Sequence, residues 1–149
     1  MKYFTIDWWR GDAECDFEQY RSYLESIRPQ LPTQLADFVD NISLHDAQII
    51  HFHLDVAHGR LEFLLSALFP SDGPAELEYH NLQLVYQGVS GFYSTATPQK
   101  ALGGPASFGE LGYDEIELLS EQLYEHRLLF SSGIEMQIQF KDIQWQRLD

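Results

Sequence analysis

The chain has 149 residues, 44% of them hydrophobic and 14% aromatic, which is enough for one folded domain with an apolar core and excludes a disordered chain. Nine Lys and Arg residues against 23 Asp and Glu residues give a net charge of −14, which disfavours nucleic acid and anionic membranes as partners. With no run of 18 apolar residues, no basic and apolar leader, and a single cysteine, we expect a soluble cytoplasmic protein without an internal disulfide.

The acidic excess is concentrated in the middle of the chain. Between residues 29 and 126, fourteen acidic residues stand against two basic ones, Arg60 and Lys100. The stretch from Glu110 to Glu125 holds six acids and no base. A field of this sign attracts a cationic partner, although an acidic surface also keeps a small protein soluble.

Two helices are predicted near the N-terminus. Residues 2–6 are aromatic and β-branched, which is typical of a strand or an extended arm, and Asp12 is a suitable N-cap after it. Apolar residues then recur at helical spacing over 17–28, and Pro29 ends the run. A second, shorter helix is predicted over 33–42 from the same spacing.

An antiparallel hairpin is predicted where the apolar spacing changes to a period of two. Residues 49–56 and 61–67 alternate between apolar and polar side chains and flank His58-Gly59, a composition that suits a tight two-residue turn. Such a turn sets Val56 opposite Leu61.

Further strands are predicted after the hairpin. A third strand covers about 75–89, with a bulge near Asn81 where the apolar phase switches, and 88–112 form a long Gly-rich loop with six of the ten glycines. The later strands are expected at 115–119, 126–130 and 134–140, the last with a phase slip near Lys141-Asp142. The sequence therefore predicts a single α+β domain over 1–149, with an N-terminal helical pair packed on one face of a five- to six-stranded antiparallel, mostly meander sheet.

A metal site is one interpretation of the closely spaced histidines. On a strand, His51 and His53 share a face, Asp55 continues that face, and Glu62 is expected opposite Asp55 across the hairpin. Two imidazoles and a carboxylate suit zinc, iron or manganese. An alternating strand also turns polar side chains to solvent without any ligand, and His58 fits a turn. We therefore expect no metal and no cofactor.

His45-Asp46 lies where helical spacing gives way to strand spacing. Asp46 or Ser43 can accept hydrogen bonds from backbone amides at this corner, while His45 bonds a nearby carbonyl group. Adjacent residues do not make half of a catalytic triad by themselves. We predict a structural role at the corner, with ligand binding as the alternative.

Aromatic residues occur near both ends of the Gly-rich loop, at Phe92, Tyr93, Phe108 and Tyr113. Such anchors suit a protein-contact surface or a lid, and they equally suit a loop that is pinned to the edge of the core. Nucleophiles are poor candidates, because Cys15 lies among acidic residues that disfavour the thiolate.

Five short stretches form an ordered series along the chain: Met1–Trp9, Ser43–Ile49, Leu82–Val89, His126–Gly133 and Phe140–Ile143. The series resembles uncharacterised small bacterial domains, some of them similar to immunity proteins of polymorphic toxin systems. This resemblance implies an α+β domain that binds rather than catalyses, and it carries over no catalytic residue.

The leading interpretation is a non-enzymatic acidic binding protein, an immunity-type inhibitor of a basic protein partner. One alternative is a small metal-dependent or ligand-binding enzyme that uses His51 and His53, and another is a structural homodimeric module. The candidate binding residues are His45, Asp46, Phe92, Tyr93, Phe108 and Tyr113.

Overall fold

The computed structural model describes residues 1–15, 17–70, 77–97 and 108–148. Its helices are α1 (Ile6–Trp9), α2 (Phe17–Ile27), the 3-10 helix η1 (Arg28–Gln30) and α3 (Thr33–Asn41). The strands within these residues are β1 (Gln48–Asp55), β2 (Arg60–Pro70), β3 (Leu77–Gln87), β4 (Gly91–Ser94), β5 (Leu111–Ser120), β6 (Leu123–Phe130), β7 (Glu135–Phe140) and β8 (Asp142–Leu148). No described helix is long and apolar enough to cross a membrane.

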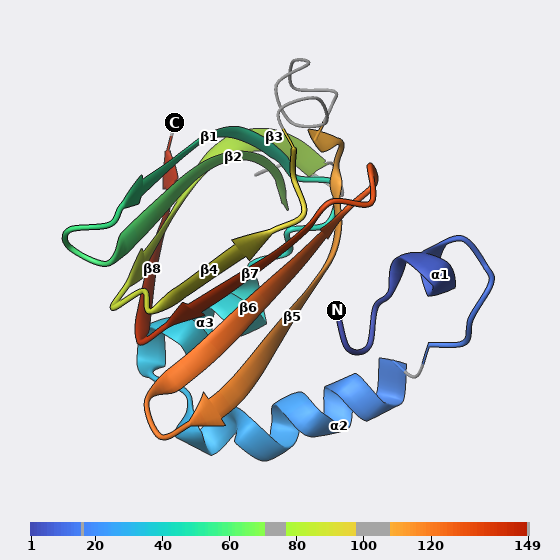
Figure 1. Ribbon diagram of the computed structural model, residues 1–149, viewed down its shortest axis with the longest axis horizontal. Helices are drawn as coiled ribbons and strands as arrows, with labels where there is room; N and C mark the ends of the chain where they lie inside the picture. Colours follow the sequence, from blue (N-terminus) through green and yellow to red (C-terminus); the bar gives the residue numbers. More distant parts are fainter. Residues whose placement is uncertain (16, 71–76, 98–107, 149) are drawn as a thin grey trace.

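The predicted α+β class is confirmed, but the strands form two four-stranded antiparallel sheets instead of one sheet of five or six (Figure 1). The first sheet has the order β1-β2-β3-β8 and the second the order β4-β7-β6-β5. The chain changes sheets after β3, where Gly88 has a φ of +63°, and again after β7. There the Lys141 amide donates to the Gln87 carbonyl group at 3.0 Å. The predicted phase slip at Lys141-Asp142 therefore marks the passage from the second sheet to the first.

The core lies between the two sheets and is closed by α3. Fully buried rings come from Phe63 and Tyr86 of the first sheet and from Phe130 and Phe140 of the second. Each large apolar side chain buried in this way contributes roughly 1.5–3 kcal/mol.

Both predicted helices are present, as α2 and α3. The α3 side chain of Phe38 lies 5.7 Å from the His126 ring of β6, centroid to centroid, while the indole N–H of Trp145 in β8 donates to Asp37 at 3.1 Å. Helix α3 therefore touches both sheets. Helix α2 lies along the free edge of β5, where its Tyr20 and Tyr23 hydroxyls accept hydrogen bonds from two β5 amides.

The β1–β2 hairpin has a longer turn than the predicted one. Leu54 lies opposite Leu61 and Asp55 opposite Arg60, so four residues form the loop and the predicted pairing of Val56 with Leu61 is wrong. The Asp55 carboxylate explains the difference, because it accepts a hydrogen bond from the backbone amide of His58 at 3.2 Å and closes the turn two residues earlier.

Two further expectations on the strands are corrected. The register shifts lie in β1, between Ile49 and His51, and at two places in β5, but not near Asn81, because β2 and β3 pair without interruption. Part of the predicted 88–112 loop is regular, since β4 pairs with β7 and β5 begins at Leu111. Residues 98–107 lie outside the described part of the chain.

Candidate functional site

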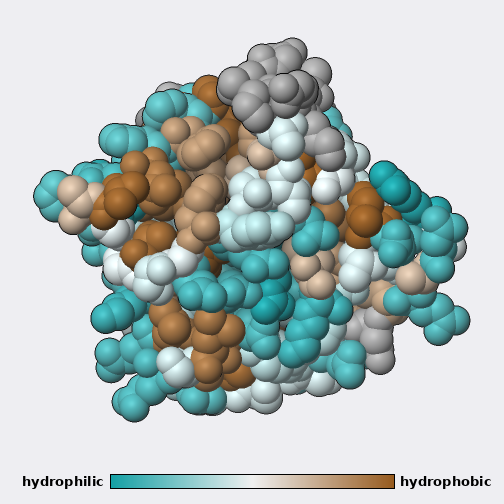
Figure 2. Space-filling model, in the orientation of Figure 1, coloured by the Kyte–Doolittle hydropathy of each residue, from teal (hydrophilic) through white to brown (hydrophobic). Residues whose placement is uncertain are grey.

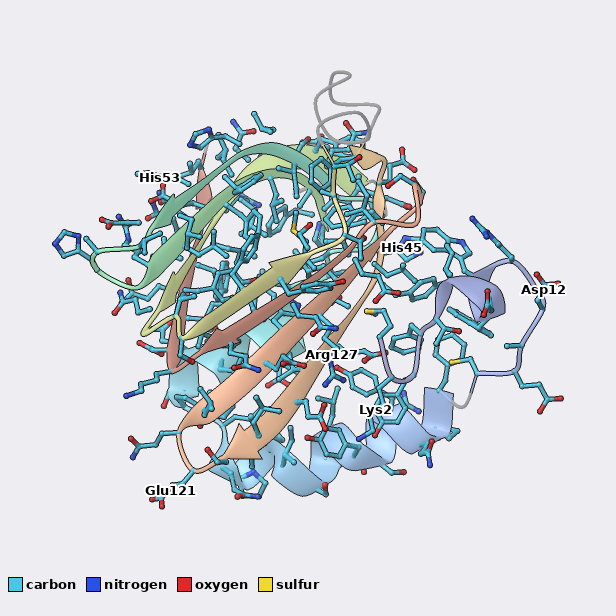
Figure 3. All side chains as sticks on the ribbon, in the orientation of Figure 1. Lys2, Asp12, His45, His53, Glu121 and Arg127 are labelled. Atoms are coloured by element: carbon cyan, nitrogen blue, oxygen red, sulfur yellow. The ribbon has the colours of Figure 1, made fainter. Side chains whose placement is uncertain are left out.

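Tyr113, at the start of β5, is the centre of an aromatic cluster that joins distant parts of the chain. Its ring lies 4.7 Å from Trp8, 5.5 Å from Trp9 and 5.6 Å from His45, all edge to face, and it stacks on Phe4 at 5.2 Å. Edge-to-face contacts at these distances are favourable for aromatic pairs. In Figure 3, His45 lies on the side of the sheets that faces the N-terminal segment. We call the surface formed by Trp8, Trp9, His45, Asp46 and Tyr113 the Tyr113 face.

A glycine in β5 makes room for one of these rings. A Cβ atom on Gly112 would lie only 2.8 Å from Cζ2 of Trp9 and closer still to two other atoms of that indole, and these are its three nearest neighbours. The indole therefore lies directly on the strand backbone. On the N-terminal side, the Thr5 hydroxyl caps α1 by accepting from the Trp8 amide at 3.2 Å, which fixes the direction in which the two tryptophans leave the arm.

His45 and Asp46 form the corner that was predicted, but their side chains bond each other. His45 Nδ1 lies 3.0 Å from Asp46 Oδ2, and both side chains are about half exposed. The Ser43 hydroxyl accepts a hydrogen bond from the His45 amide at 3.3 Å, as expected for this corner. Asp46 adopts a left-handed backbone with φ of 64°, while its amide donates to the Leu111 carbonyl group at 2.8 Å. Such strain in a non-glycine residue is frequently found at functional sites.

A hollow of about 300 Å³ adjoins the corner on the side of the first sheet. It is lined by Asn41, Ser43, His45, Asp46, Leu68, Pro70 and Leu77. The hollow offers hydroxyl, imidazole and carboxylate groups beside an apolar wall. The Ser43 hydroxyl accepts from the His45 backbone amide, and the imidazole lies against the adjacent Asp46 carboxylate.

The other predicted binding residues lie elsewhere. Phe92 in β4 lies 6.4 Å from Phe52, and its neighbour Tyr93 is exposed. Phe108 is buried and packs edge to face on Phe130 at 5.2 Å, so it anchors its segment to the core. Of the six predicted residues, only His45, Asp46 and Tyr113 come together.

Of the predicted metal ligands, His51 and His53 are exposed on β1, while Asp55 and Glu62 are engaged with other groups. Glu62 lies opposite His53 and not opposite Asp55, which corrects the expected pairing. Its carboxylate forms an ion pair with Arg60 at 2.9 Å and accepts from the Gln83 amide at 2.5 Å. Asp55 lies 2.7 Å from Nδ1 of His58, and this hydrogen bond lowers the pKa of the Asp55 carboxyl. No group of three or more metal-ligating side chains lies together among the described residues.

A buried polar network was missed by the sequence interpretation. His126 is fully buried, with Nε2 at 2.9 Å from Asp114 Oδ2 and Nδ1 at 2.7 Å from the Tyr86 hydroxyl. Burial raises the pKa of Tyr86 well above its usual value, so the phenol that bonds Nδ1 is neutral. The network therefore joins β5, β6 and β3 across the core. One feature of the sequence points to this network: His126 alternates with Tyr124 and Leu128 along its strand, so it occupies a position on the face that is otherwise apolar.

Comparison with known proteins adds little to this description. No family model matches the sequence, and no curated protein matches it. A crystal structure of an uncharacterized protein from Neisseria gonorrhoeae is similar with a TM-score of 0.48 and 12% identity, over 71% of this chain and 95% of that one. A likeness of this degree supports no conclusion about function.

Proposed function

We propose that this chain is a non-enzymatic binding protein that recognises a basic protein partner through the Tyr113 face, in the manner of an immunity-type inhibitor. The observation that supports it is the grouping of three further rings around Tyr113, next to the half-exposed Asp46 carboxylate. Ring faces attract guanidinium and ammonium groups, and a neighbouring carboxylate adds a charged hydrogen bond to the same cation.

The distribution of charge supports the same proposal. Most described cations already pair with carboxylates, as in Lys2–Glu117, Arg21–Glu18, Arg28–Asp40, Arg60–Glu62 and Arg127–Glu125. Exposed acids near α1, such as Asp7 and Asp12, have no ion pair among the described residues. A cationic partner would therefore be steered toward this side and would associate faster at low salt.

The surface chemistry favours recognition by rings and charge over a large apolar interface. On the face seen in Figure 2, hydrophobic residues form several patches that hydrophilic residues separate. Interfaces of this kind depend on a few aromatic and charged anchors at their centre.

The experiment is a binding measurement with the protein encoded by the neighbouring reading frame, titrated at two salt concentrations. The double variant His45→Ala/Asp46→Asn should weaken binding by about tenfold or more, equivalent to roughly 1.4 kcal/mol. The matched control is His58→Ala/Asp55→Asn, because it removes another exposed imidazole–carboxylate pair that lies in the β1–β2 turn. Absence of binding by the wild-type chain, or equal losses in the two double variants, would refute the proposal.

A further inference from the structure

Three backbone amides of the N-terminal arm, residues 1–5, converge on one buried carboxylate of the second sheet, and the Met1 ammonium adds an ion pair with Glu135 at 3.1 Å. Glu115 of β5 is only 1% exposed. Its Oε1 atom accepts from the Tyr3 amide at 2.6 Å and from the Phe4 amide at 2.7 Å, and its Oε2 atom accepts from the Lys2 amide at 2.9 Å. Three successive amides that converge on one anion form a backbone nest.

The positive charge near Glu115 is shared among several acids. The nearest cation is Arg127, whose Nη1 lies 3.5 Å from Glu115 Oε2. The same guanidinium also donates to Glu125 at 2.6 Å and to Glu117. Lys2 and Arg127, both labelled in Figure 3, meet at Glu117, which pairs with the Lys2 ammonium at 3.2 Å. A buried carboxylate that lacks sufficient hydrogen-bond donors is costly, so the arm amides are part of what satisfies the Glu115 carboxylate in this position.

The docked arm brings aromatic side chains to the Tyr113 face. Phe4, 5% exposed, is the last residue of the nest and packs on Trp8 at 5.7 Å as well as on Tyr113. Trp8 and Trp9 follow within one turn of helix. If the arm leaves the sheet, both tryptophans lose their positions over Tyr113.

We infer that Glu115 is a positioning residue: it clasps the arm and so assembles the Tyr113 face from two chain segments about a hundred residues apart. The clasp itself is independent of any partner. The consequence for recognition rests on the proposed function, so the two are tested by separate measurements.

The clasp is tested by amide hydrogen exchange, followed by NMR, at residues 2–4 in Glu115→Gln. The variant loses the anion and replaces one of the two accepting oxygens by an NH2 group, so exchange at these amides should become at least tenfold faster. Glu117→Gln is the matched control, because it also loses contacts with Arg127 and Lys2 but accepts from no arm amide. It should change the same exchange rates by less than about threefold. Unchanged exchange in Glu115→Gln, or equal acceleration in both variants, would overturn the inference.

A second pair of variants covers the case in which Glu115→Gln does not fold. Lys2→Pro removes one amide donor of the nest and leaves the carboxylate in place, while Lys2→Ala removes the same side chain and keeps the amide. The amides of residues 3 and 4 should exchange faster in Lys2→Pro than in Lys2→Ala, and equal rates would contradict the clasp.

For recognition, Glu115→Gln should weaken binding of the neighbouring gene product by about tenfold. Full binding with a released arm, while His45→Ala/Asp46→Asn still weakens binding, would overturn the positioning role. Binding that neither Glu115→Gln nor His45→Ala/Asp46→Asn weakens would count against the proposed function, and the clasp would still be decided by the exchange rates.

Discussion

The seat of Trp9 on Gly112 gives the sharpest test of the Tyr113 face. The perturbation is Gly112→Ala, alone and together with Trp9→Ala. In the folded chain the new methyl group would lie 2.8 Å from Cζ2 of Trp9, whereas ordinary contacts begin at 3.4 Å, and two ring atoms are closer still. The indole must therefore move by about 1 Å or more to restore ordinary contact.

The expected cost follows from two opposing effects. Overpacking of this kind costs about 1–3 kcal/mol, while replacing glycine by alanine within a strand returns about 0.5–1 kcal/mol through the unfolded chain. Gly112→Ala should therefore lower the free energy of unfolding by about 1–2 kcal/mol in the wild-type background. In the Trp9→Ala background the clash is gone, and the same substitution should be neutral or stabilising by up to about 1 kcal/mol.

The assay is urea unfolding of the four proteins of this double-mutant cycle, with equal denaturant slopes as the condition for comparing them. The coupling energy between the two positions should be about 2 kcal/mol. An equal cost of Gly112→Ala in both backgrounds would show that the indole does not lie on this glycine. In that case Trp9 would have to be removed from the Tyr113 face.

Four further outcomes are expected elsewhere in the fold. Tyr20→Phe and Tyr23→Phe should each lower the free energy of unfolding by about 1 kcal/mol. Each should also speed hydrogen exchange of the β5 amide that donates to the lost hydroxyl. Because burial raises the pKa of Tyr20, the folded state holds this proton more tightly, so stability should fall as the pH rises above about 10, and less steeply in Tyr20→Phe. His126→Ala should cost about 3 kcal/mol in thermal or urea unfolding, and more than Asp114→Asn, because Asp114 is partly exposed. Asp46→Ala should be about 1 kcal/mol less stable than Asp46→Gly in the same assay, since glycine adopts a positive φ without strain and alanine does not.

The parts of the fold that depend on local spacing were predictable. The helix over Phe17–Ile27 and the alternation in β2 follow from periodicities of 3.6 and 2 within a few residues, whereas the apolar Ile50 and Phe52 of β1 are exposed and this strand does not alternate in burial. The division into two sheets was not predictable in this way, because a strand that bends out of one sheet into another carries only a weak local signal. At Gly88 that signal was interpreted as the start of a loop, and at Lys141 as a phase slip within one sheet.

The site was only half predictable for a related reason. His45, Asp46 and Tyr113 were selected from the sequence, but Tyr113 was assigned to a loop, whereas it lies in β5. The tryptophans that complete the face were not selected at all. Their contact with Tyr113 spans about a hundred residues and depends on a glycine and a buried glutamate, and neither of these residues has a distinctive local pattern.

The acidic run from Glu110 to Glu125 shows why net charge is a poor guide to the charge that a partner meets. Four of its six acids have internal roles: Asp114 bonds His126, Glu115 clasps the arm, and Glu117 and Glu125 surround Arg127. Their charge is largely offset by contacts within the fold. The exposed carboxylates without an ion pair among the described residues include Asp7, Asp12 and Glu14, which lie in or just after α1. These three carboxylates lie close in sequence to Trp8 and Trp9 and outnumber the one cation between them, Arg10, so the electrostatic and aromatic arguments favour the same side of the molecule for different physical reasons.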